Sequence, residues 1–173
     1  MQKIVIIGTL HGEYTPKKEL EEILNFYSPN QIFVEIYQGD INKNYLEKYP
    51  QEMIFALNWA RSKKVELSGF DSEIDIFKGG FSASKNQKII DQQKPVLNKF
   101  NWKDFNKKEI FNKINSLAEK KFIDSAANFI REEEMLNNIK KKIIPDGVVL
   151  ILTGCGHLDF FEKKIKKADF PLR

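Results

Sequence analysis

The sequence has 173 residues and a mass of 20.2 kDa, which predicts one domain with a sizeable core rather than two independent ones. Its 28 basic and 24 acidic residues leave a formal charge of +4, and because they are scattered along the chain they predict no nucleic-acid partner. No apolar run approaches the roughly 18 residues of a membrane span, and Cys155 is the single cysteine, which excludes an intramolecular disulfide. We therefore expect a cytoplasmic protein without a membrane partner.

Short β-branched runs alternate along the chain with segments whose apolar residues recur at helical spacing. In chain order, the pattern predicts a strand over residues 3–8, a helix over 16–26, a strand over 31–35, a helix over 50–63, a strand over 65–70, a helix over 116–142, a strand over 148–153 and a helix over 159–166. Thr15 is expected to cap the first helix, with Pro16 at its first position. This alternation predicts a single α/β domain across residues 1–173, with a mainly parallel sheet and flanking helices.

Residues 79–115 lie outside this alternation. Pro95 interrupts them, so we expect loops and short helices there. Gly79 and Gly80 offer a hinge, and the aromatic residues of the segment offer an apolar underside. The segment is therefore a candidate mobile lid over the edge of the sheet.

Both histidines of the chain end the same short motif after an apolar run. Gly-Thr-Leu-His ends at His11, and Gly-Cys-Gly-His ends at His157. Since parallel strands end at one edge, we expect the two imidazoles to lie together there, with the glycines allowing sharp turns. A lone histidine is more often a surface or core residue, but the repeated context favours a shared site.

Other polar residues are weighed against simpler interpretations. Glu35 and Asp71 each follow an apolar strand, where a carboxylate can face a cleft or, as is common for aspartate, start a turn. Arg131 precedes three glutamates, a pattern that is typical of a solvated helix face. Cys155 lies beside the proposed site, but His157 is too close in sequence to activate it as a nucleophile, so no catalytic role is expected.

The two Gly-x-x-His motifs, together with the Phe-Val-Glu segment that ends at Glu35, resemble the TraB/PrgY family and its relatives Tiki, GumN, the erythromycin esterases and ChaN. The order of elements matches from end to end. The Arg-Glu-x-x-Met segment that starts at Arg131 is similar to an Arg-acidic-x-x-Met helix of that family, and Glu52 is similar to a further family acid. The resemblance implies a fold like that of ChaN and the erythromycin esterases, with a site formed by His11, Glu35 and His157. The chain is shorter than many relatives and has no membrane helices like theirs, so a membrane or pheromone-shutdown role is not implied.

Two neutral imidazoles and one carboxylate form a three-ligand set, so His11, Glu35 and His157 are candidate ligands for a divalent Mn, Fe, Co or Zn ion. The first functional prediction is metal-assisted hydrolysis of a peptide or small ester, with Arg131 stabilising the oxyanion. The resemblance links the Tiki branch to metal-dependent proteolysis. Asp71 and Glu52 are expected to support the site residues rather than to contact substrate.

Two alternatives remain open. In the first, which the esterase branch of the resemblance implies, no metal takes part: His11 takes a proton from water, Glu35 orients it and His157 steadies the oxyanion. In the second, the chain is a binding module that holds a peptide or haem without turnover.

Overall fold

The computed structural model describes residues 1–11, 14–80, 83–114 and 123–173 of the chain. Its sheet has five strands in the order β3-β2-β4-β1-β5, and each neighbouring pair of these strands runs parallel. The strands are β1 (Gln2–Thr9), β2 (Gln31–Tyr37), β3 (Glu66–Asp71), β4 (Gly147–Gly154) and β5 (Ala168–Asp169). The predicted α/β fold with a mainly parallel sheet is confirmed, and the short strand β5 is an addition to it.

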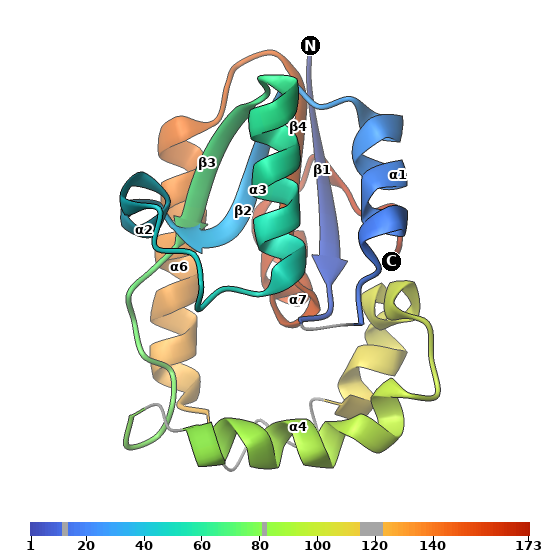
Figure 1. Ribbon diagram of the computed structural model, residues 1–173, viewed down its shortest axis with the longest axis vertical. Coiled ribbons are helices and arrows are strands. Elements are labelled where there is room, and N and C mark those ends of the chain that lie inside the picture. The colour runs from blue at the N-terminus through green and yellow to red at the C-terminus, as the bar shows by residue number, and fades with distance from the viewer. Residues whose placement is uncertain (12–13, 81–82, 115–122) are drawn as a thin grey trace.

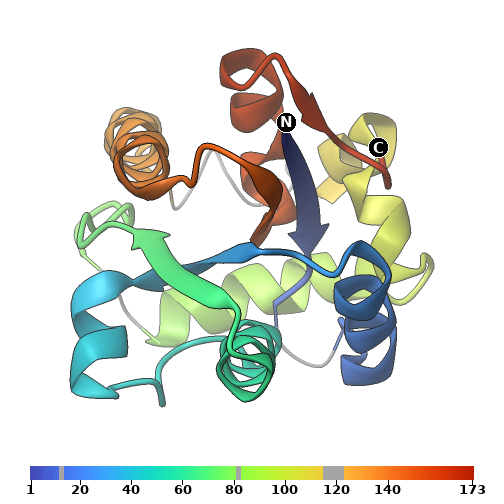
Figure 2. The same ribbon diagram turned by 90° about the horizontal axis from the view of Figure 1, so that it is seen from above.

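Helices cover both faces of the sheet, as parallel strands require. Figure 2 shows α1 (Lys17–Tyr27) and α3 (Gln51–Lys63) on one face, and α6 (Ser125–Lys142) and α7 (Leu158–Lys164) on the other. A short helix that the sequence did not predict, α2 (Gln38–Lys43), packs against β2 and β3. No helix among the described residues is long and apolar enough to cross a membrane.

The register of β1 and β4 brings the two Gly-x-x-His motifs together. These strands pair along their whole length, from Gln2 opposite Gly147 to Thr9 opposite Gly154. Both strands are buried at their centres, which explains their near-continuous apolar sequences. The two chain segments therefore leave the sheet side by side at its carboxyl edge.

Residues 83–114 form a cover below that carboxyl edge (Figure 1). The prediction of loops and short helices is wrong for α4 (Ala83–Leu97), a helix of 15 residues. Pro95 lies in the last turn of α4, where it removes one helical hydrogen bond but does not end the helix, which continues to Leu97. The 3-10 helix η1 (Trp102–Asn106) and a helical stretch over 108–114 complete the cover.

Three boundary predictions are wrong in informative ways. Thr15 does not cap α1, because its hydroxyl accepts a hydrogen bond from the backbone N–H of Leu10 and donates one to the Leu10 carbonyl, each at 2.9 Å. It thereby closes the loop that carries His11. The strand β2 continues two residues past Glu35, which lies inside the strand rather than at its end. The predicted helix over 116–142 begins at Ser125 in the structure.

The late start of α6 has a local cause. The side chain of Asp124 accepts hydrogen bonds from the N–H groups of Ala126 and Ala127 and so caps the helix. Ile123 forms an antiparallel bridge with Phe77 and is therefore not part of the helix. Residues 116–122 of the predicted helix lie outside the described residues.

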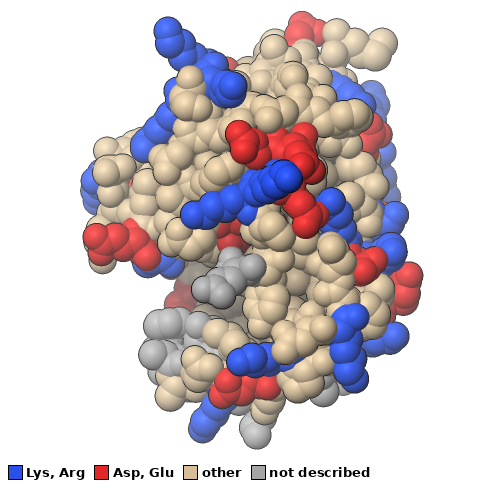
Figure 3. All heavy atoms as spheres, turned by 45° about the vertical axis from the view of Figure 1, so that its right-hand side comes forward, with Lys and Arg blue, Asp and Glu red and all other residues tan. Residues whose placement is uncertain are grey.

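Charged side chains are distributed as the scattered sequence pattern predicts. On the face shown in Figure 3, Lys and Arg side chains lie among Asp and Glu side chains instead of gathering in one patch. This face offers no basic surface of the kind that binds a phosphate backbone.

Candidate active site

His11 is held by a carboxylate from α3. Its Nδ1 lies 2.7 Å from Oε1 of Glu52, whose side chain is fully buried in the first turn of that helix. A neutral imidazole in this contact carries its proton on Nδ1 and leaves Nε2 as a proton acceptor. The His11 side chain is 48% exposed and lines a cavity.

His157 is held in the same way by a different helix. Its Nδ1 lies 2.8 Å from Oε1 of Glu132 on α6, and both side chains are buried. Its Nε2 faces Oε1 of Glu35 at 3.4 Å, longer than a normal N–H···O hydrogen bond. The contact of Nδ1 with Glu132 thus orients the ring, and Nε2 can bind a further partner.

Glu35 lies between the two Gly-x-x-His motifs and is 5% exposed. Its Oε2 accepts hydrogen bonds from the Thr153 hydroxyl at 2.8 Å and from the Gly154 N–H at 2.6 Å. Its Oε1 accepts one from Arg131 at 3.1 Å and faces His157. The carboxylate therefore fixes the end of β4 to β2 and supports His157.

Arg131 joins two of the predicted carboxylates. Its guanidinium binds both oxygens of Asp71 at 2.8 Å, in addition to its bond with Glu35. This two-pronged geometry holds the guanidinium in one plane. Arg131 acts through Glu35, because it does not line the cavity that the histidines face.

The charges of the site are set by these contacts. Burial lowers the pKa of His157, but the charge of Glu35 and the hydrogen bond to Glu132 outweigh it and raise that pKa to about 9. Burial raises the pKa of Glu35, but the charges of His157 and Arg131 hold it well below its usual range. At neutral pH His157 is an imidazolium beside an ionised Glu35.

His11 differs from His157 in the strength of these effects. The protein packed around its ring lowers its pKa, but the hydrogen bond to Glu52 and the charge of Glu35 outweigh this and raise the pKa above the ordinary histidine value. The charge of His157 opposes that rise. The charge of His157 therefore lowers the pH at which His11 becomes neutral and able to accept a proton.

The glycines that precede the histidines are required by close approach and not by a sharp turn. Gly154 has a φ of −60°, which any residue adopts, but a Cβ there would lie 2.9 Å from Nε2 of His11. A Cβ on Gly8 would lie 2.7 Å from Leu158. The expectation of turn-forming glycines is wrong at both positions, and the close contact at Gly154 shows that His11 reaches across to β4.

The donor set leaves no room for a metal ion at Glu35. A carboxylate offers about four lone-pair directions, and those of Glu35 face Thr153, Gly154, Arg131 and His157. The positive charge of Arg131, 3.1 Å from Oε1 of Glu35, also disfavours a divalent ion on that carboxylate. Within the described ranges, no group of three or more His, Cys, Asp or Glu side chains is arranged to hold a metal. Metal-assisted hydrolysis stays a prediction that this geometry does not favour.

A cavity of about 650 Å³ opens in front of the two histidines. His11 and His157 line it, whereas Glu35, Glu52 and Glu132 do not appear on its surface. Cys155 also borders it, but burial and the charge of Glu35 raise the pKa of its thiol to about 12. A thiol of that acidity is a poor nucleophile at neutral pH, consistent with the expectation of no catalytic role.

The structure brings all the predicted site residues to one place, joined by direct contacts or by the close approach of His11 to Gly154. Sequence reasoning missed three contributors: Glu132, Thr153 and Asn106. Glu132 was interpreted as part of a solvated face, although it shares helical spacing with the buried Met135. The side chain of Asn106 bonds both the N–H and the carbonyl of Gly8, at 2.8 and 2.9 Å, and no sequence pattern pointed to it.

Comparisons with protein-family models, curated proteins and solved structures find no match for this chain. The resemblance to the TraB family thus rests on the sequence motifs alone and stays a prediction.

Proposed function

We propose that the protein is a hydrolase of an ester or peptide bond that uses its two histidines without a metal. The observation that carries the proposal is the pair of imidazoles, each oriented at Nδ1 by a buried carboxylate and each lining the same cavity. Acid–base catalysis needs this arrangement, because an imidazole acts through one nitrogen while its other nitrogen is fixed.

In the proposed reaction, His11 is the general base. Its Nε2 takes a proton from a water molecule, whose oxygen forms a bond to the carbonyl carbon of the substrate. Glu52 stabilises the imidazolium that results, through the 2.7 Å contact at Nδ1.

His157 supplies the complementary acid. As an imidazolium it donates a hydrogen bond from Nε2 to the oxygen that becomes negative, and then gives that proton to the leaving oxygen or nitrogen as the bond to carbon breaks. Solvent returns His11 and His157 to their starting protonation states. Glu35, held by Arg131, keeps His157 charged until this step.

Hydrolysis of 4-nitrophenyl butyrate by metal-depleted protein tests the proposal. We expect turnover to persist after chelation and dialysis, without bound metal by elemental analysis. We expect His11→Gln to lower kcat/KM by about 100-fold or more, and Lys88→Gln, on the outer face of α4, to leave it unchanged. Activity that appears only with added Mn, Co, Fe or Zn would restore the metal-assisted prediction. Bound peptide or haem without turnover would favour the binding-module alternative.

The location of the protein remains a proposal too. The single, buried and unpaired thiol of Cys155 suits a reducing compartment, and we propose the cytoplasm on that basis.

A further inference from the structure

The cavity in front of the histidines is walled by apolar side chains on both sides of the catalytic pair. We infer, resting on the proposed function, that the substrate is an uncharged ester or amide with an apolar group on each side of the bond that is cleaved. The cavity lies within the size range of sites for small organic molecules.

One end of the cavity lies under the segment that leads from β3 toward α4. Ile76 and Phe77 line the cavity there. Ile123, which precedes α6 and pairs with Phe77, also lines it. In Figure 1 this segment and the start of α6 lie on the left.

The opposite end lies under the helical stretch over 108–114, on the right in Figure 1. Leu97, Phe111 and Ile114 line it. The floor carries His11 and His157, and Ile89 and Ile90 of α4 lie on the lining across from the sheet edge. A substrate whose carbonyl meets the histidines thus extends into apolar surroundings in two directions.

In the described part of this lining, charge is confined to the histidines. Apart from the two histidines, the polar residues among the described lining residues are uncharged: Thr9, Tyr14, Gln93 and Asn128, beside the backbone of the glycines. Placing a charged group against apolar walls without a partner costs several kcal/mol, so the described walls on either side of the histidines select against carboxylates and amines there. Gln93 and Asn128 offer amides that can bond an uncharged polar group.

The two sides of the substrate are tested separately with esters whose leaving alcohols have similar acidity. We expect kcat/KM for benzyl hexanoate to be about tenfold or more higher than that for benzyl acetate, and likewise higher than that for methyl hexanoate. Each shorter ester lacks the apolar group that fills one end of the cavity. Benzyl hemisuccinate should be cleaved at least about tenfold more slowly than benzyl butyrate, which has nearly the same length but no charge.

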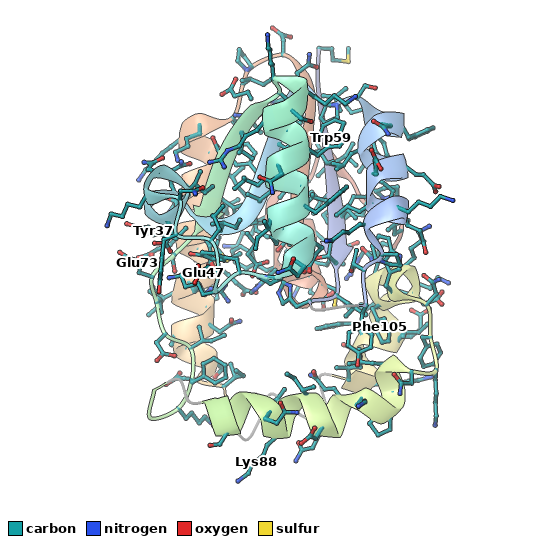
Figure 4. The ribbon with its side chains drawn as sticks, in the orientation of Figure 1. Tyr37, Glu47, Trp59, Glu73, Lys88 and Phe105 are labelled. Carbon is teal, nitrogen blue, oxygen red and sulfur yellow. The ribbon has the colours of Figure 1, made fainter. Side chains whose placement is uncertain are left out.

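Variants of the lining supply a second readout. Ile90→Glu places a charge in the cavity and should lower kcat/KM for benzyl hexanoate by about tenfold or more. Lys88→Gln changes the net charge by the same amount on the outer side of α4, where Figure 4 shows Lys88 pointing away from the sheet, and should have no effect. Ile76→Gln and Phe111→Gln should each weaken discrimination on one side of the ester only. Thermal unfolding of each variant identifies any loss that comes from folding.

Binding of benzyl hexanoate to the His157→Gln variant, followed by calorimetry, separates this inference from the proposed function. Binding that Ile90→Glu abolishes, together with no hydrolysis by the natural chain, supports the apolar ligand class and overturns the hydrolase. Hydrolysis of the acetate, the hemisuccinate and the hexanoate at equal rates overturns the substrate class and leaves the hydrolase standing.

Discussion

Glu132 and His157 meet through a 2.8 Å contact between Oε1 and Nδ1, with both side chains buried between α6 and the end of β4. The neighbouring Glu133 forms an ion pair with Lys164 at the surface. Adjacent glutamates on one helix thus have different tasks, which allows a matched comparison.

Replacing Glu132 with Gln removes the charge that helps to hold the proton on His157. We expect kcat/KM to fall by about tenfold or more and the pKa of His157 to move down, since the hydrogen bond that its ring donates to Glu132 raises that pKa. Titration of the His157 ring by NMR measures the shift. Glu133→Gln should change neither quantity, and an equal effect of the two variants would remove Glu132 from the site.

His11→Gln and Glu35→Gln should separate function from stability. His11 is half exposed, so its loss should change the free energy of unfolding by no more than about 1 kcal/mol. Glu35→Gln leaves the charge of Arg131 partly uncompensated in a buried place and should cost about 3 kcal/mol. Denaturant unfolding of both variants checks the difference, and activity should be lost in both. Equal stabilities would mean that Glu35 does not compensate Arg131.

The rate should depend on pH in the form of a bell. His11 must be neutral to accept a proton, so kcat/KM rises as pH passes its pKa, which lies above 6.5. His157 must be charged, so the rate falls above about pH 9. Because the pKa of His157 is higher in the folded protein than the value of 6.5 in the unfolded chain, its protonation also stabilises the fold. This contribution is complete below pH 6.5 and is lost as pH rises through about 9. A rate that still increases at pH 10 would contradict the acid role of His157.

Gly154→Ala tests the close approach of His11 to β4. The added methyl group would lie 2.9 Å from Nε2 of His11, so the ring must move, and kcat/KM should fall by about tenfold or more. Gly156 also lines the cavity, but a Cβ there would make only an ordinary contact of 3.6 Å with Phe111, so Gly156→Ala should lower kcat/KM less than Gly154→Ala does. Unfolding measurements should show small effects for both, and unchanged activity in Gly154→Ala would mean that the position of His11 is not critical.

The predicted lid should be confined to α4. Gly79 and Gly80, just before the N-terminus of α4, both have positive φ, a backbone conformation that glycine adopts more easily than other residues do. After α4, η1 is fixed, because Trp102 and Lys103 both bond Glu19 of α1. Hydrogen exchange should therefore be faster in α4 than in η1 or β1 and should slow when an apolar ester binds. Equal protection of α4 and β1 would end the lid prediction.

The sequence predicted four of the five strands of the sheet and the convergence of its polar residues, because both follow from short-range patterns. The apolar runs before His11 and His157 fix two buried strands, and parallel pairing then places their ends together. It could not predict which residues hold the imidazoles. The role of Glu132 depends on which face of α6 meets the end of β4, and that of Asn106 depends on a contact across 98 residues. The length of α4 was missed because a proline was treated as a break of the whole segment, although Pro95 lies only two residues before the end of the helix at Leu97.

The pairing of β1 with β4 also sets when the protein can become active during its synthesis. The partners Thr9 and Gly154 are far apart in the sequence, and between them the ribosome must complete α1, α3 and α6. A nascent chain that stops before β4 contains His11 and Glu52 but neither His157 nor the strand that anchors Glu35. The half of the site that depends on β4 therefore forms last. Premature termination anywhere upstream of β4 yields fragments without the acid–base pair rather than partly active enzymes.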